Sequence, residues 1–370
     1  MSFYNIAKRK ILIMKNKRTV LVTGGCGFIG ANFVRLLRKE YGDWRIINLD
    51  KLTYAGNLKN LQGISEGEMY RFVKGDICNG DLVAELFTTE QIDTVVHFAA
   101  ESHVDRSITG PADFIQTNIV GTFTLLEAAR KSWGKCGTGE GDNCFLHVST
   151  DEVYGSLGSS GFFTEKTAFD PRSPYSASKA SSDHLVNAYF HTYGLPVRLT
   201  NCSNNYGPYQ FPEKLIPLVF NNSMHNKSLP VYGDGKNVRD WLYVKDHCEA
   251  IVAVLQKGQN GQCYNIGGNN EKENLEVVTV ICDILDRKLG LPESGQPRKS
   301  LITFVKDRLG HDRRYAIDAS KIKDQLDWEP QVTFETGMEK TVEWYLANQN
   351  WVREIVDGSY MKYYKQMYTV

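Results

Sequence analysis

A glycine-rich turn between an apolar run and a helical pattern constrains the fold of this chain more than any other feature. In the stretch VLVTGGCGFIG, Gly24, Gly27 and Gly30 follow the apolar run and precede the helical pattern. Glycines let the backbone turn tightly and approach a pyrophosphate, which the positive N-terminus of the helix stabilises. Asp50 ends the next apolar run, 20 residues after Gly30, where a carboxylate binds ribose hydroxyls and repels a 2′-phosphate. The arrangement predicts an NAD site, in which Asp76, after a third run, is placed to bind the adenine amine.

The first half of the chain alternates apolar runs with helical patterns, which is typical of parallel βαβ units. The expected strands are 19–23, 45–49, 70–74, 94–98, 144–150 and 196–201. The expected helices are 28–40, 81–89, 112–131 and 176–193. We therefore predict an α/β fold built on a Rossmann-type, doubly wound parallel sheet.

The sequence pattern changes after about residue 206, where short expected strands and proline-containing loops replace the regular alternation of apolar runs and helical patterns. We predict a disordered basic tail at 1–17, an NAD-binding domain at 18–205, and mainly a smaller mixed α/β domain at 206–370. The stretches RDWLYVKDHCEAIVAVL and YNIGG are expected to return to the main sheet, so the boundary is not a single cut.

Charge and cysteine content exclude several classes of protein. The chain has 43 basic and 43 acidic residues, so no net field attracts nucleic acid or an anionic membrane. No apolar stretch approaches the roughly 18 residues of a membrane helix. The eight cysteines include no C-x-x-C pair, so neither a metal site nor a disulfide framework is predicted. Reduced thiols favour a cytoplasmic enzyme.

The stretch SPYSASKA suggests an oxidation site. Tyr175 and Lys179 are four residues apart on an expected helix, so their side chains share one face. A neighbouring ammonium lowers the pKa of a tyrosine, which then takes a proton from a hydroxyl. With Thr150 at a strand end to orient that hydroxyl, NAD would accept the hydride, and Lys179 is also placed to bind the nicotinamide ribose.

Two adjacent acids, Asp151 and Glu152, follow Thr150 in the stretch STDEVYG. Burying two carboxylates beside a core costs stability unless both are solvated or hydrogen-bonded. Taken alone, the pair favours the cap of a following helix. The Gly/Ser-rich loop that comes next argues against a long helix, which leaves proton transfer as the alternative.

Beyond these patterns, the chain resembles the extended short-chain dehydrogenase/reductase family, and most closely its dTDP-glucose 4,6-dehydratases. The resemblance runs from about Thr19 to the C-terminus and includes TGGCGFIG, HFAAESHVDRS, STDEVYG, SPYSASKASSDH, NCSNNYGPYQFPEKLIP, YNIGG and DRLGHDRRYAID. It implies oxidation of a sugar C4 hydroxyl by Tyr175 and NAD⁺. Glu152 would then remove the C5 proton while Asp151 protonates the departing C6 hydroxyl, before hydride returns to C6.

The resemblance also implies binding residues and a homodimer that forms through the segments 112–131 and 176–193. The implied cofactor-binding residues are Gly24, Gly27, Phe28, Ile29, Gly30, Asp50, Lys51, Thr53, Asp76, Ile77, Ala99, Ala100, Ser102, Thr117, Tyr175, Lys179 and Asn205. The implied substrate-binding residues are His103, Thr150, Asn204, Glu213, Lys214, Tyr232, Arg239, Asn274, Arg308 and His311. Arg239 and Arg308 suit the two phosphates because guanidinium groups bind phosphate oxygens in pairs, whereas His103 is as well explained by a structural role.

Three alternatives stay open at this point. The first is a dehydratase for a UDP-, CDP- or GDP-linked sugar, and the second is a 4-epimerase. Sugar-nucleotide epimerases typically carry small residues where this chain has Asp151 and Glu152, so the acid pair favours a dehydratase. The third is a non-catalytic NAD sensor, which would need neither the acid pair nor Tyr175 and Lys179.

Overall fold

The computed structural model describes residues 17–134, 142–307 and 310–355, so the predicted tail lies outside them apart from Lys17. Its main element is a seven-stranded sheet in the order β10-β6-β5-β4-β1-β2-β3. Every neighbouring pair in this sheet is parallel, which confirms the predicted fold class. The strands are β1 (Thr19–Thr23), β2 (Arg45–Asp50), β3 (Tyr70–Lys74), β4 (Thr94–His97), β5 (Cys144–Thr150), β6 (Val197–Cys202) and β10 (Cys263–Ile266).

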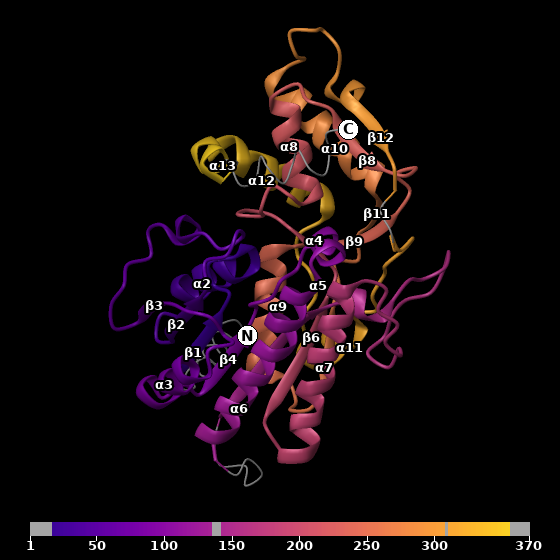
Figure 1. Ribbon diagram of the computed structural model, residues 1–370. Helices are drawn as coiled ribbons and strands as arrows, with labels where there is room; N and C mark the ends of the chain where they lie inside the picture. The colour runs from indigo at the N-terminus through magenta and orange to yellow at the C-terminus, as the bar shows by residue number, and fades with distance from the viewer. Residues whose placement is uncertain (1–16, 135–141, 308–309, 356–370) are drawn as a thin grey trace, which may run out of the picture.

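Helices cover both faces of the sheet (Figure 1). One layer contains α2 (Phe28–Glu40), α9 (Val244–Lys257) and α11 (Ser320–Leu326). The other contains α3 (Gly80–Glu90), α6 (Thr122–Ser132) and α7 (Pro174–Tyr193). Along β1, Val20 and Val22 pack into the first layer and Leu21 into the second. Strands buried on both faces need continuous apolar runs, which is why the sequence shows them.

A second, smaller group of elements forms the C-terminal lobe, whose core is separate from those of the main sheet (Figure 1). Its strands are β7 (Asn204–Tyr206), β9 (Val238–Tyr243) and β11 (Glu271–Glu273) in one sheet, and β8 (Leu229–Tyr232) and β12 (Ile302–Val305) in another. Its helices are α8 (Leu215–Met224), α10 (Asn274–Leu289), α12 (Phe334–Ala347) and α13 (Gln349–Ile355).

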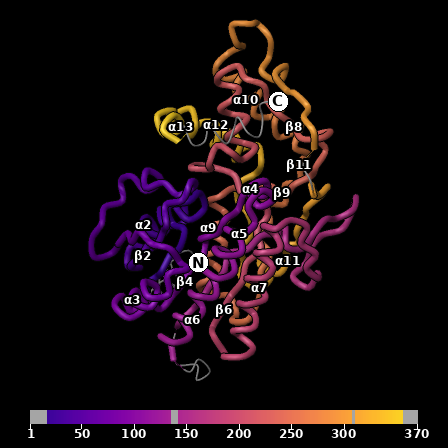
Figure 2. Tube along the Cα trace, viewed as in Figure 1, coloured from indigo at the N-terminus to yellow at the C-terminus, as the bar shows by residue number. Residues whose placement is uncertain are grey.

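Three late elements, β10, α9 and α11, belong to the layers of the main sheet although they follow residue 206. In Figure 2, α9 lies beside α2 from the first half of the chain, and α11 packs in the same layer as these two helices. The exact division at residues 205 and 206 stays a prediction. No helix in the described part of the chain is long and apolar enough to cross a membrane.

The expected helix at 112–131 is interrupted. The structure has α5 (Pro111–Phe114), a π-helical stretch (Ile115–Gly121) and then α6. Inside the π-helical stretch, the amide of Asn118 bonds the backbone of Glu101 and the hydroxyl of Ser178. A wider helical turn of this kind is frequent at functional sites, and periodicity alone cannot reveal it because the apolar pattern continues through the turn.

Candidate active site

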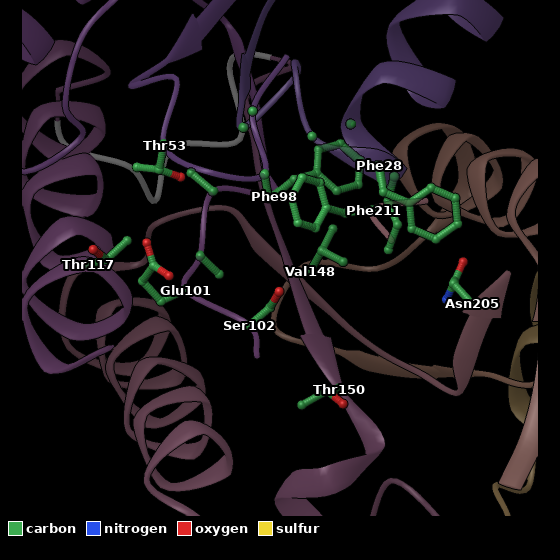
Figure 3. Close-up of a pocket in the computed structure, with 18 of the residues that line it drawn as sticks. Phe28, Thr53, Phe98, Glu101, Ser102, Thr117, Val148, Thr150, Asn205 and Phe211 are labelled. Atoms are coloured by element: carbon green, nitrogen blue, oxygen red, sulfur yellow. The ribbon is translucent and has the colours of Figure 1, made fainter. Parts of the chain in front are cut away.

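One cavity opens at the carboxyl ends of the central strands, where open α/β sheets bind their ligands. It is lined by every predicted cofactor-binding residue and by all five predicted catalytic residues. Figure 3 shows the rings of Phe28, Phe98 and Phe211 grouped on its wall, with Thr150 further along at the end of its strand. Residues far apart in the sequence therefore meet in a single space.

The glycine-rich turn has the geometry that a dinucleotide requires. Gly24 has φ +71°, and a Cβ there would lie 2.7 Å from the backbone nitrogen of Ala99. A Cβ on Gly30 would lie 2.3 Å from the carbonyl oxygen of Gly24. Gly27 is the N-cap residue of α2 and provides no side-chain cap. Since Gly27 also lines the cavity, the N-terminal amides of α2 are available to bind an anion there. These residues fit NAD.

Asp50 shapes the same turn. Its Oδ2 accepts a hydrogen bond of 2.8 Å from the amide of Cys26, and its Oδ1 accepts one of 2.8 Å from the amide of Leu52. Burial raises the pKa of Asp50, while these two amides oppose the shift. Beyond it, Lys51 forms an ion pair of 2.7 Å with Asp76. This end of the cavity is thus polar, and hydrogen bonds and an ion pair hold its side chains in place.

The acid pair follows β5 directly. Residues Asp151–Tyr154 form one turn of 3-10 helix, called η3, whose N-cap is Thr150. The Thr150 hydroxyl accepts a hydrogen bond of 3.3 Å from the amide of Glu152. Since Thr150 supplies the cap, neither acid does. The capping alternative therefore does not account for the pair.

The two acids have different surroundings. Asp151 is 1% exposed, and its Oδ2 has no hydrogen-bond partner among the described residues. Burial raises the pKa of Asp151 well above its usual range, and the charges of Glu152 and Asp240 raise it further. Glu152 is only partly buried. These surroundings favour the protonated form of Asp151, which is the form that an acid beside a base requires.

Tyr175 and Lys179 are buried on α7, but their electrostatics differ from the expectation. The Lys179 ammonium donates a hydrogen bond of 2.8 Å to the carbonyl oxygen of Val148, and burial lowers its pKa. Burial raises the pKa of Tyr175 well above its usual range, and Glu152 raises it further. The expected lowering of the Tyr175 pKa by Lys179 is therefore wrong in this structure, because desolvation outweighs any help from the ammonium.

A cluster of buried polar side chains around Asp183 lies next to Lys179. One turn later on α7, Asp183 accepts a hydrogen bond of 2.8 Å from the hydroxyl of Ser149 and lies 3.2 Å from Nε2 of His147. Burial raises the pKa of Asp183 to about 7, while Lys179 lowers it. Asp183 and His147 were not predicted as site residues, although Asp183 continues the four-residue spacing of Tyr175 and Lys179 on the buried face of α7.

Apart from His103 and Arg308, the predicted substrate residues fall into two groups. Thr150, Asn204, Glu213 and Lys214 line the cavity. There, Lys214 donates a hydrogen bond of 3.1 Å to the carbonyl oxygen of Ser102, and Glu213 pairs with Arg106 at 3.1 Å. Glu101 and Phe211 also line the cavity without having been predicted as site residues, although each lies inside a stretch that carries the family resemblance, HFAAESHVDRS and NCSNNYGPYQFPEKLIP.

The second group lies on the C-terminal lobe and does not line the main cavity. The rings of Tyr232 and His311 are 6.1 Å apart. Arg239 donates a hydrogen bond of 2.9 Å to the carbonyl oxygen of Asp312, and its charge lowers the pKa of Asp151, so it lies near the acid pair. Asn274 begins α10. Arg308 lies outside the described residues.

His103 is also outside the cavity lining. It is 5% exposed and precedes α4 (Val104–Thr109), where its carbonyl oxygen accepts a hydrogen bond of 3.1 Å from the amide of Ser107. This position favours the structural role over substrate contact.

Comparison with known proteins identifies the family of this chain. A family model described as GDP-mannose 4,6 dehydratase matches residues 21–341. A dTDP-glucose 4,6-dehydratase of Xanthomonas campestris pv. campestris is 61% identical over 343 residues, which cover 92% of this chain and 97% of that protein. The chain belongs to the dTDP-glucose 4,6-dehydratase family. A second member of this family, from Salmonella typhimurium, is 55% identical and covers 94% of this chain and 98% of its own length.

Solved structures of the dTDP-glucose 4,6-dehydratase family share the fold. The enzyme from Bacillus anthracis, in complex with NAD, has a TM-score of 0.81 and 50% identity, and covers 91% of this chain and 99% of its own. A UDP-glucose 4-epimerase from Thermotoga maritima has a TM-score of 0.78 but 27% identity, with 90% and 99% covered. The fold is thus common to both kinds of enzyme, whereas the sequence is nearer to the dehydratases.

The raised pKa of Asp151 has a consequence for stability. Below the usual Asp pKa of 3.8, Asp151 is neutral in the folded and the unfolded chain. As the pH rises above that value, only the unfolded chain releases the proton, so the wild type loses stability relative to Asp151→Asn. We expect a loss of up to about 1.4 kcal/mol per pH unit until the pH reaches the raised pKa.

Urea unfolding of the wild type and of Asp151→Asn from about pH 4 to 8 measures this difference. A difference in unfolding free energy that stays constant over the whole range would contradict a protonated Asp151.

Proposed function

We propose that this chain dehydrates dTDP-glucose to dTDP-4-keto-6-deoxyglucose with tightly bound NAD. The observation that carries the proposal is the acid pair at the end of β5, where a proton-bearing Asp151 and a more exposed Glu152 share one cavity with Tyr175. Elimination of water needs an acid and a base in addition to Tyr175, whereas plain oxidation needs only the base that Tyr175 provides. Membership of the dTDP-glucose 4,6-dehydratase family supports the same reaction.

Each step has a residue to carry it. Tyr175 takes the proton of the C4 hydroxyl, which Thr150 orients. Glu152 removes the C5 proton, whose acidity the C4 ketone increases, and Asp151 gives its proton to the departing C6 oxygen. After hydride returns to C6, C5 is reprotonated. When bound, NAD⁺ supplies the acceptor for the C4 hydride, the source of the C6 hydride, and a positive charge that favours the Tyr175 phenolate.

For the cofactor, we propose that the α2 amides hold the pyrophosphate, that Asp50 binds the adenine ribose, and that Lys179 binds the nicotinamide ribose. For the substrate, we propose that Arg239 and Arg308 hold the diphosphate and that Tyr232 lies against the base. Asn204, Glu213 and Lys214 would contact the sugar from the cavity wall. The domain assignment follows, with NAD bound by residues 18–205 and the nucleotide sugar mainly by 206–370.

We also propose that the enzyme is a cytoplasmic homodimer. A dimer is supported by exposed apolar side chains along the 111–132 segment, among them Ile115 at 54% and Phe123 at 45% exposure, and by Tyr193 at 46% at the end of α7. These are the two segments that the resemblance assigns to the interface. The cytoplasm supplies both NAD and nucleotide sugars.

Glu152→Gln tests the proposed division of labour. The amide keeps the shape of the side chain but takes no proton, so C4 oxidation proceeds and elimination stops. With dTDP-glucose we expect enzyme-bound reduced nicotinamide to accumulate, visible by absorbance, while product formation falls by about 10²-fold or more.

Tyr175→Phe provides the matched control for this experiment. It removes the base for the first step, so neither reduced nicotinamide nor product should appear. Wild-type turnover by Glu152→Gln would refute the role of Glu152, and accumulation of reduced nicotinamide in Tyr175→Phe would refute that of Tyr175.

Phe123→Arg tests the dimer. A charged side chain at the centre of an apolar interface costs more than the interface gains, so we expect monomers in analytical ultracentrifugation at concentrations where the wild type is dimeric. The control is Phe304→Arg on β12, because Phe304 is 56% exposed but lies on the C-terminal lobe. A wild-type monomer, or a dimer that survives Phe123→Arg, would contradict the assignment.

A further inference from the structure

Helix α13 is linked to the glycine-rich turn through the buried side chain of Asn60, which hydrogen-bonds to both. The indole Nε1 of Trp351 donates a hydrogen bond of 2.8 Å to Oδ1 of Asn60. The Nδ2 of Asn60 then donates one of 2.8 Å to the carbonyl oxygen of Cys26. Asn60 lies in η1 (Leu58–Leu61) and is 2% exposed. Figure 1 shows α13 above the part of the chain that contains α2.

Cys26 lies within the glycine-rich turn, and hydrogen bonds fix both its amide and its carbonyl oxygen. Its amide donates to Asp50, as described above. Its carbonyl oxygen accepts from Asn60 and, at 3.0 Å, from the amide of Asn57. The orientation of this peptide sets the orientation of its neighbours Gly24 and Gly27, which line the cavity.

The side chain of Trp351 is fixed by neighbouring aromatic rings as well. The ring of Trp351 packs against Trp344, with centroids 5.0 Å apart, and against Tyr209 at 6.0 Å. Arg35 of α2 lies over the ring of Tyr209, and its Nε donates a hydrogen bond of 2.7 Å to the carbonyl oxygen of Asn60. Asn60 is therefore the point at which the C-terminal lobe, α2 and the glycine-rich turn meet.

We propose that Trp351 and Asn60 form a latch by which α13 holds the glycine-rich turn in its cofactor-binding shape and slows the release of NAD. Both are positioning residues, since neither lines the cavity. The inference rests on the proposed function, because it assumes that the cavity binds NAD. Retention matters for a redox-neutral reaction, in which the same cofactor must stay in place from the first step to the last.

Trp351→Phe tests the latch, since it keeps an aromatic ring but removes the N–H donor. We expect the exchange of bound NAD for isotopically labelled NAD to become about two- to tenfold faster, the usual contribution of one hydrogen bond. The KM for added NAD should rise by a similar factor, while kcat at saturating NAD should stay within about twofold of wild type, because no reacting group changes.

Two further variants complete the design. Trp328→Phe is the matched control, because Trp328 and Trp351 are both 8% exposed and Trp328 packs beside the main sheet rather than in the lobe core of Trp351. It should exchange NAD at the wild-type rate. Asn60→Asp keeps the acceptor for Trp351 but removes the donor to Cys26, so it should also speed up exchange.

The outcomes separate the two proposals. If the wild-type chain binds NAD and both Trp351→Phe and Asn60→Asp exchange it at the wild-type rate, the latch is refuted and the proposed function stands. The latch is also refuted if Trp328→Phe speeds up exchange as much as Trp351→Phe. If the wild-type chain binds no NAD, both proposals fall.

Discussion

The parallel pairing of β5 between β4 and β6 determines where chemistry can take place in this protein. All seven residues of β5 are buried, so the chain can present polar groups only where the strand ends. There it places Thr150, Asp151 and Glu152 in succession, opposite the α7 residues Tyr175 and Lys179 and beside the glycine-rich turn after β1. Redox and acid–base groups thus share one cavity because the strand ends share one edge.

Burial is the main electrostatic influence on this cavity. It raises the pKa of Asp151 and of Tyr175, and it lowers that of Lys179. For Asp151 the effect is useful, because a neutral carboxyl can donate a proton at neutral pH. For Tyr175 the same effect opposes catalysis. A positive charge near Tyr175, such as bound NAD⁺ would supply, would oppose this effect and favour the phenolate.

Much of the architecture follows from local patterns in the sequence. The apolar runs predict six strands of the main sheet to within one or two residues, and Phe28–Glu40 is a helix as expected. The residues of the glycine-rich turn and the acid pair could be predicted because their chemistry depends on short spacings. In contrast, the raised pKa of Asp151, the π-helical stretch around Asn118 and the contact between Trp351 and Asn60 depend on residues distant in the sequence. No local pattern encodes those relations, because burial and packing are set by the whole fold.

We propose that a single cavity oxidises C4, removes water across C5 and C6, and reduces C6 of the same sugar. Mass spectrometry of the product from dTDP-glucose deuterated at C4 tests this internal hydride transfer, with UDP-, CDP- and GDP-linked sugars run in parallel. We expect a dTDP-linked product that has lost one water and carries the deuterium at C6. A product that keeps the water, as an epimerase would give, or one that has lost the deuterium to solvent, would contradict it.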